Sequence, residues 1–296
     1  MKHHYIPQFY LKQWAGPDGK VLRYRKLPDD QVVSKRLFPK AIGYGEDLYR
    51  SPYPEEELAQ RLERDFFQRL DAIAAAALAE LIVPNLPILP DAPLHDWVHF
   101  MMSLLFRQPT NWVQLHVSAM RHYKEAVEAT RRDIAADPSM DTEENREMVS
   151  RYMDDIELTK RLHASFRKIV FNDNVIAHLS TFEWMIMDVP ASCPTLLLSD
   201  DPMMRPVGLK TEHAHIATPL TPRRLLVGMG TRQFATHVSR MKAKEIVHVT
   251  NISTVQGARE FVAAVDDRQT SFVAKHFGSN PKKPLASTLI SGPPLA

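Results

Sequence analysis

Residues 3–14 read His3-His4-Tyr5-Ile6-Pro7-Gln8-Phe9-Tyr10-Leu11-Lys12-Gln13-Trp14, which brings two histidines and four aromatic side chains to the start of the chain. Chain termini usually fray in solvent unless the rest of the fold holds them. Because so many rings favour burial, we predict that this segment folds inward and that its histidines are fixed in place. Adjacent residues of an extended chain point to opposite faces, so one of the two imidazoles serves any given site. That imidazole is either a metal ligand or general base, or a member of a structural hydrogen-bond network.

The composition is that of a globular protein with a sizeable core. Its 296 residues are 44% hydrophobic and 24% charged, which suits one large domain or two ordinary ones. A net charge of +2 is too small to indicate nucleic-acid binding through bulk electrostatics. Cys193 is the single cysteine, so no intrachain disulfide can form, as expected in a reducing cytosol. No apolar run approaches the roughly 18 residues that span a bilayer, and the N-terminus lacks the apolar stretch of a signal peptide. We therefore expect a cytoplasmic protein with no membrane segment.

Hydrophobic periodicity predicts a helical first half that follows a small N-terminal β-hairpin. A short helix is expected over about residues 7–15, and alternating apolar residues predict the hairpin at residues 21–35. A hairpin of this size is not stable alone, so it must dock on another element. Apolar residues then recur every three or four positions from Leu58 to Leu81, which predicts a long helix that begins after residues 52–54. Further helices are expected from Leu94 to Pro109, over about residues 110–136 and over about residues 142–171.

The pattern changes near residue 180, where short apolar runs alternate with Pro and Gly turns. Strands are predicted at residues 182–188, 195–198, 215–220, 224–228 and 246–250, and a last helix from a cap at Ser253 to Val265. The fold class is therefore α+β, with a helical first half, an antiparallel strand-rich second half and a small N-terminal β-hairpin. We expect one α+β domain over residues 1–278, within which residues 52–180 either share the core or form a helical subdomain. The tail over residues 279–296 is rich in Pro, Ser and Gly and is expected to be disordered.

Three charged residues lie where a site or a structural role would use them. Glu63 lies at the edge of the apolar face of the long helix, as a boundary residue or as a carboxylate turned into a polar pocket. Arg107 ends an apolar helix, where a cation complements the helix dipole or binds a phosphate or carboxylate through its fork. Asp200 follows a buried-looking strand in Ser199-Asp200-Asp201-Pro202. That motif is typical of a turn, but a carboxylate there is also placed to bind a cation or to orient a histidine.

His95 and His99 are one helical turn apart in His95-Asp96-Trp97-Val98-His99, a spacing similar to the His-Glu-x-x-His zinc pattern. Aspartate replaces the glutamate and no third ligand is apparent, so chance spacing in a chain with 13 histidines is the better interpretation. The sequence contains no Gly-rich phosphate loop and no Gly-x-Ser-x-Gly nucleophile motif.

The motif His4-Tyr5-Ile6-Pro7-Gln8-Phe9-Tyr10-Leu11 resembles the start of an uncharacterised bacterial and fungal family, domain of unknown function 4238. Members of that family begin with a His-x-Tyr-Val-Pro segment that leads into Tyr/Phe-Leu. The resemblance continues to about residue 267 through Leu62-Glu63-x-x-Phe66, Arg107-x-Pro109, Ser199-Asp200-x-Pro202, Pro219-Leu220-Thr221-Pro222 and Asn251. Trp14, where the family is expected to have Phe, and the His95/His99 pair depart from it. The family has no established activity, so the resemblance supplies candidate positions and no mechanism.

These positions suggest a hydrolase if they converge in space. His4, Glu63 and Asp200 would hold a divalent metal ion. Arg107 would bind a phosphate or carboxylate, and Asn251 would orient substrate or water. The inventory suits metal-assisted hydrolysis such as phosphodiester cleavage by a nuclease, so a nucleic acid or another phosphate-containing substrate would be the partner. The alternative is a non-catalytic binding or scaffold protein in which the same residues form a buried polar network.

Overall fold

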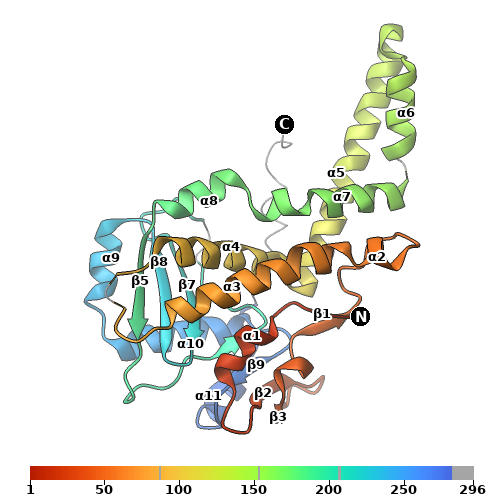
Figure 1. Ribbon diagram of the computed structural model, residues 1–296. Coiled ribbons are helices and arrows are strands. Elements are labelled where there is room, and N and C mark those ends of the chain that lie inside the picture. Colours follow the sequence, from red (N-terminus) through yellow and green to blue (C-terminus); the bar gives the residue numbers. More distant parts are fainter. Residues whose placement is uncertain (87, 153, 206–207, 282–296) are drawn as a thin grey trace.

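The computed structural model describes residues 1–86, 88–152, 154–205 and 208–281 of the chain. Along the chain, a series of helices lies between the strands of the first 46 residues and the strands that follow residue 182, and in space strands of both groups lie side by side, as β2 and β9 do (Figure 1). The predicted α+β class is confirmed. Most of the tail that was expected to be disordered, residues 282–296, lies outside the described residues. The single domain over residues 1–278 stays a prediction.

The described strands form three small sheets, and every pair is antiparallel. β1 pairs with β4, the order β5-β8-β7 makes a three-stranded sheet, and the order β3-β2-β9-β6 makes a four-stranded sheet. The strands are β1 Lys2–His4, β2 Val21–Lys26, β3 Val32–Leu37, β4 Tyr44–Glu46, β5 Glu183–Asp188, β6 Leu198–Ser199, β7 His215–Thr221, β8 Arg224–Met229 and β9 Val262–Ala264.

The predicted hairpin is β2–β3, and it docks on strands from far along the chain. β2 pairs with β3 on one edge and with β9 on the other, where Leu22 lies opposite Ala264. β9 pairs in turn with β6, which places Leu198 opposite Ala263. The expectation that the hairpin needs a docking partner is confirmed, because strands from the second half complete its sheet.

Helices occupy most of residues 56–180 and return after residue 231. α3 and α4 cross the molecule side by side, and α5 and α6 project from one end (Figure 1). No helix in the described ranges is long and apolar enough to cross a membrane. A π-helical turn, Leu62–Phe67, precedes α3 directly. The α-helices are α1 Gln8–Leu11, α2 Glu56–Ala59, α3 Gln68–Leu81, α4 Asp91–Arg107, α5 Pro109–Ala136, α6 Glu143–Tyr152, α7 Asp155–Val170, α8 Asp173–Ser180, α9 Arg232–Ser239, α10 Ala243–Gly257 and α11 Thr270–His276.

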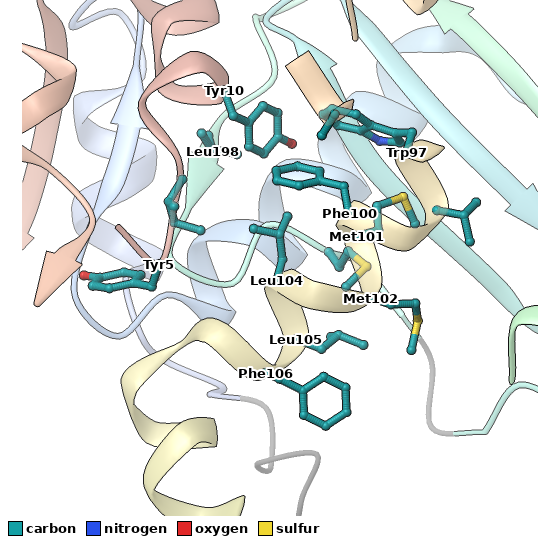
Figure 2. Close-up of a cluster of buried hydrophobic side chains, with 14 of the residues drawn as sticks. Tyr5, Tyr10, Trp97, Phe100, Met101, Met102, Leu104, Leu105, Phe106 and Leu198 are labelled. Carbon is teal, nitrogen blue, oxygen red and sulfur yellow. The ribbon is translucent and has the colours of Figure 1, made fainter. Parts of the chain in front are cut away.

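The ring-rich segment at the start of the chain folds into the main core, as predicted. Tyr10 and Trp14 are fully buried, and Tyr10 packs edge-to-face on Trp97 of α4 (Figure 2). Tyr10 Oη donates a hydrogen bond to the carbonyl of Pro219 in β7. Trp14 Nε1 donates to the carbonyl of Leu196 at 2.8 Å. Both rings thus find partners for their polar atoms, and the segment is held between α4 and the second half of the chain.

Two parts of the helix prediction are corrected by local structure. The expected helix over residues 142–171 is two helices, because Asp154 accepts hydrogen bonds from Ile156 N and Glu157 N and caps the start of α7. The expected long helix after residues 52–54 begins as the single turn α2 and then widens into the π-helical turn before α3. A periodicity of three to four residues does not distinguish these interruptions from a continuous helix.

The strand predicted at residues 246–250 is wrong, and of the helix predicted from Ser253 to Val265 the structure confirms only the part up to Gly257. Residues 243–257 form α10, and Val262–Ala264 form β9. Ile246, Thr250 and Thr254 are buried at helical spacing, a pattern that a short apolar run does not reveal. Residues 195–197 are not in a strand, and β6 begins at Leu198. The second half is therefore less rich in strands than predicted, since α9, α10 and α11 lie within it.

Trp14→Phe should destabilise the protein by about 2 kcal/mol, because phenylalanine leaves the Leu196 carbonyl without its donor and part of the indole volume empty. Urea denaturation followed by circular dichroism measures the change. Phe38→Leu replaces an exposed aromatic side chain with a smaller apolar one and is the control, with an expected change in stability below about 0.5 kcal/mol. An unchanged urea midpoint for Trp14→Phe would contradict the anchoring role of the indole.

Candidate functional site

A cavity of about 720 Å³ lies where β1, the start of α1 and the π-helical turn meet. Its titratable lining residues include Lys2, His4, Lys40, Glu63 and Asp71. Of the residues that the sequence suggested for a site, His4 and Glu63 line this cavity. The cavity therefore joins the N-terminal motif to a carboxylate about 60 positions along the chain.

The two adjacent histidines have different roles because β1 is extended. β1 pairs with β4, with His3 opposite Gly45, and places the two rings on opposite faces as predicted. His3 is fully buried, and its Nδ1 accepts a hydrogen bond from Tyr49 N at 2.9 Å. Its Nε2 must then carry the proton and donates to Gln60 Oε1 at 2.7 Å. Both nitrogens of His3 are used within the protein, so His3 is a structural residue.

The two ring nitrogens of His4 have different surroundings in the described residues. The backbone of Lys40 accepts a hydrogen bond from the ring, which raises the pKa of His4, but burial has the larger effect and lowers that pKa from 6.5. His4 Nε2 is buried and has no hydrogen-bond partner among the residues that the structure describes. The bond to Lys40 therefore belongs to Nδ1, and Nε2 keeps a lone pair that can accept a proton. At neutral pH His4 is an uncharged imidazole at the cavity.

Glu63 belongs to the π-helical turn Leu62–Phe67 and is buried. π-Helical turns inside helices are rare and occur frequently at functional sites. Burial raises the pKa of Glu63 to about 7, and the neighbouring carboxylate of Asp71 adds to this rise. The Arg107 guanidinium and a hydrogen bond from Gln68 oppose it. Glu63 Oε2 is buried with no hydrogen-bond partner in the described part of the chain. Glu63 is therefore a carboxyl group that can hold or release a proton near neutral pH.

Arg107 lies next to these carboxylates and is fully buried. Its Nη1 is 2.7 Å from Asp71 Oδ1, and its guanidinium carbon lies 4.3 Å from the ring centre of Phe67. The ion pair does not have hydrogen-bond geometry, and neither Nε nor Nη1 has an acceptor within the described ranges. Burial raises the pKa of Asp71 even though Arg107 lowers it. The Arg107 side chain thus reaches from the end of α4 to α3, where Asp71 supplies a negative charge for its buried positive one.

Asp71 was missed by the sequence analysis, although a signal for it exists. Asp71 follows Glu63 by eight residues, and positions seven or eight apart in a helix share a face. A second carboxylate on the face that carries Glu63 was therefore available as a prediction. The spacing does not predict that Asp71 pairs with the buried Arg107 of the neighbouring helix.

Asp200 binds the backbone and does not line the cavity. Its carboxylate accepts hydrogen bonds from three successive backbone N–H groups, those of Arg259, Glu260 and Phe261, at 3.0–3.2 Å. Gln108 Nε2 donates a further bond at 3.0 Å. These bonds hold the pKa of Asp200 down, but complete burial has the larger effect and raises it to about 6. Asp200 fixes the turn before β9 to the start of α5.

Asn251 also binds the backbone of its neighbours. Its Oδ1 accepts from Leu197 N, and its Nδ2 donates to the carbonyl of Thr195, both at 2.9 Å. Gln269 Oε1 lies 3.1 Å from the same Nδ2. All the polar atoms of this buried amide are therefore occupied, and Asn251 holds the segment before β6 against α10. The structure does not bring Asp200 or Asn251 to the cavity with His4 and Glu63.

Within residues 1–281, apart from the short gaps, no three His, Cys, Asp or Glu side chains are placed to hold a metal ion together. The predicted metal set of His4, Glu63 and Asp200 is thus not assembled in this structure. The rings of His95 and His99 lie against one another, with centres 4.2 Å apart and planes tilted by 58°, and have no third ligand among those residues.

Arg107→Met should destabilise the protein by about 3 kcal/mol, because it leaves the mostly buried Asp71 without its cation. The double variant Arg107→Met/Asp71→Asn removes that uncompensated charge and should recover part of the loss. Chemical denaturation of both variants measures the effect. Arg131→Met, at an exposed ion pair on α5, is the control and should change little. Equal losses in the single and double variants would contradict the pairing of Arg107 with Asp71.

The raised pKa of Glu63 makes stability depend on pH in a defined direction. A carboxyl group with a pKa of 4.5 in the unfolded chain and about 7 in the fold binds its proton more tightly when folded, so stability falls as the pH rises through that interval. Through this carboxyl group the wild type should lose about 2.5 kcal/mol of unfolding free energy between pH 5.0 and pH 8.0, and Glu63→Gln should not show this loss. Glu80→Gln, at an exposed position of α3, should keep the wild-type pH dependence. Parallel curves for wild type and Glu63→Gln would show that Glu63 titrates normally.

A family model described as "Protein of unknown function (DUF4238)" matches residues 2–268, a range that includes His4, Glu63, Arg107, Asp200 and Asn251. No curated protein and no solved structure matches the chain. The resemblance seen in the N-terminal motif is thereby confirmed. Because the match covers nearly all of the described residues, the chain belongs to the DUF4238 family of proteins of unknown function.

Proposed function

We propose that the protein is a hydrolase in which His4 and Glu63 transfer protons to and from a phosphate-containing substrate in the cavity. One observation carries the proposal: His4 Nε2 and Glu63 Oε2 are buried, have no partner among the described residues, and belong to residues that line the same cavity. Buried polar atoms normally have partners, so two such atoms at one cavity are what a binding or catalytic site requires.

The acid–base properties of the pair suit hydrolysis. Burial lowers the pKa of His4 from 6.5 and raises the pKa of Glu63 to about 7. Slightly below pH 7 the imidazole is therefore neutral while a large fraction of the carboxyl groups keep their proton. A neutral imidazole can accept a proton from the attacking water, and a protonated carboxyl group can donate one to the leaving oxygen. Glu63 would thus be the general acid and His4 the general base.

The charges around the cavity favour an anionic substrate. The ammonium groups of Lys2 and Lys40 belong to exposed residues that line the cavity. The guanidinium of Arg107 pairs with Asp71, another residue of the cavity lining, at 2.7 Å. Cations at the entrance of a site attract a phosphate group and help to position it. Phosphodiester cleavage, including that of a nucleic acid, is the narrower form of the proposal.

The proposed proton transfers do not involve a divalent metal ion. His4 and Glu63 would supply two ligands, whereas Asp200 is already bound by backbone donors and by Gln108 outside the cavity lining. Two protein ligands fall short of the usual set of three or more for zinc and similar ions. The assay therefore compares phosphoester hydrolysis with and without Mg²⁺ and Mn²⁺, which tests the metal-assisted reaction.

A non-catalytic scaffold is the second candidate, and the roles of Asp200 and Asn251 favour it. Both side chains use their hydrogen-bonding groups to hold backbone segments together. If His4 and Glu63 belong to the same structural network, the cavity binds a ligand without converting it, or binds water alone. The two candidates differ in whether the wild-type protein turns over a phosphoester.

His4→Gln and Glu63→Gln should each lower phosphoester hydrolysis by at least about 100-fold, because each removes one proton-transfer group. Turnover of p-nitrophenyl phosphate and bis(p-nitrophenyl) phosphate measures the effect, with Glu80→Gln as the folded control. In the wild type, kcat/KM should rise as the pH rises through the lowered pKa of His4 and fall above about pH 7, where Glu63 loses its proton. Full activity in both variants sinks the proposed roles. No wild-type turnover of either ester, with or without metal, supports the scaffold.

A further inference from the structure

A chain of three hydrogen-bonded side chains lies outside the cavity, between the loop after β4 and helices α5 and α7. Ser51 Oγ is hydrogen-bonded to His163 Nδ1. His163 Nε2 is 3.0 Å from His116 Nε2. His116 Nδ1 is 3.2 Å from the carbonyl oxygen of Trp112 one turn earlier in α5. Ser51 and His163 are buried, and His116 is partly buried.

The direction of every hydrogen bond in this chain follows from the last one. A carbonyl only accepts, so His116 Nδ1 carries a proton and, in the neutral ring, His116 Nε2 is an acceptor. His163 Nε2 must then donate to it, which leaves His163 Nδ1 as the acceptor for the Ser51 hydroxyl. With both imidazoles neutral, each nitrogen has one partner and the three elements are joined.

No carboxylate is among the groups that shift the pKa of either imidazole in the part of the chain that the structure describes. Trp112 packs against both rings, with centres 4.6 Å from His116 and 5.2 Å from His163. The charged groups of the packed elements contact other partners: Arg50 pairs with Glu56 beside the loop, Lys124 of α5 pairs with Asp155 of α7, and Lys160 of α7 lies over the ring of Tyr53. Burial lowers the pKa of both histidines, and the charge of His116 lowers that of His163 further, to about 3.

Extra protons disrupt this arrangement in two stages. One proton on His116 Nε2 forces His163 to accept at Nε2 and to move its own proton to Nδ1, which reverses the chain and places a charge in an apolar setting. A second proton sets two N–H groups against each other at 3.0 Å, and the His116–His163 contact is lost. The same side chains therefore join the elements at neutral pH and separate them in acid.

We propose that Ser51, His163 and His116 form an acid-sensitive latch that holds the loop after β4 against α5 and α7. The same loop contacts residues next to the candidate site. Tyr49 stacks on His3, and its hydroxyl donates a hydrogen bond to the carbonyl of Arg107 at 2.6 Å. Opening of the latch would release a segment two residues from Tyr49. The inference does not depend on the reaction proposed for the cavity, since it concerns the packing of the loop alone.

The first test compares the pH dependence of unfolding in wild type and His163→Gln. A histidine with a pKa of 6.5 in the unfolded chain and about 3 in the fold binds its proton more readily when unfolded, so its contribution to stability is lost as the pH falls below 6.5. Between pH 7.5 and pH 5.0 the unfolding equilibrium constant of wild type should increase roughly thirtyfold more than that of His163→Gln. His122→Gln replaces an exposed histidine of α5 and should behave as wild type. Equal pH dependence in wild type and His163→Gln overturns the latch.

A second test uses the wild-type protein and so does not require that His163→Gln folds. Hydrogen–deuterium exchange, corrected for the intrinsic effect of pH, should show residues 47–53 and the adjoining turns of α5 and α7 losing protection at pH 5.0, while α10 keeps its protection. Ser51→Ala removes the first link of the chain and should show the faster exchange of residues 47–53 already at pH 7.5. Unchanged exchange of this loop in acid, or in Ser51→Ala, overturns the proposal.

Discussion

The attachment of the chain's first residues to its second half is the constraint on which the structure depends. The indole of Trp14 donates to the carbonyl of Leu196, and the ring of Tyr10 lies between α4 and β7 with its hydroxyl on Pro219. A hydrogen bond that closes so long a loop is small beside the entropy of closure, so burial of the aromatic rings must supply most of the stabilisation. With Tyr10 and Trp14 anchored, the preceding strand β1 pairs with β4, and His4 lies in the cavity lining.

Two kinds of buried polar group bear on the candidate site, and what marks His4 and Glu63 is that their unpartnered atoms belong to residues lining one cavity. His3, Asp200 and Asn251 use their polar atoms to bind backbone or amide groups, and each holds distant segments together. Glu63 is buried and His4 is half-buried at the cavity, and each has one buried atom without a partner in the described residues. A buried polar atom without a partner costs stability, and at a cavity a ligand or a proton can use it.

Two residues of the candidate site could be singled out from the sequence because their residue type and position carried a signal. Histidine in a ring-rich terminus and a carboxylate beside an apolar helix face were recognisable, and both line the cavity. Asp200 was also predicted as a site residue, although its carboxylate binds three backbone N–H groups. The sequence of a turn that carries a carboxylate does not show whether the carboxylate binds a ligand or the backbone. The Ser51–His163–His116 chain left no trace in the sequence, since its members come from three separate elements.

The sequence by itself determined the fold class, the hairpin, most of the helices and the inward folding of the first segment, because local periodicity and aromatic density set which faces are buried. Only the tertiary structure decided that residues 246–250 are helical and that residues 262–264 form a strand: the free edge of β2 accepts β9, and the core receives one face of α10. The tertiary structure also decided which polar residues meet. Arg107 reaches Asp71 because α3 and α4 pack together, while Asp200 is held by the turn before β9 and does not reach the cavity. Meetings of this kind depend on how elements pack against one another, and neither spacing nor composition along a single element contains that information.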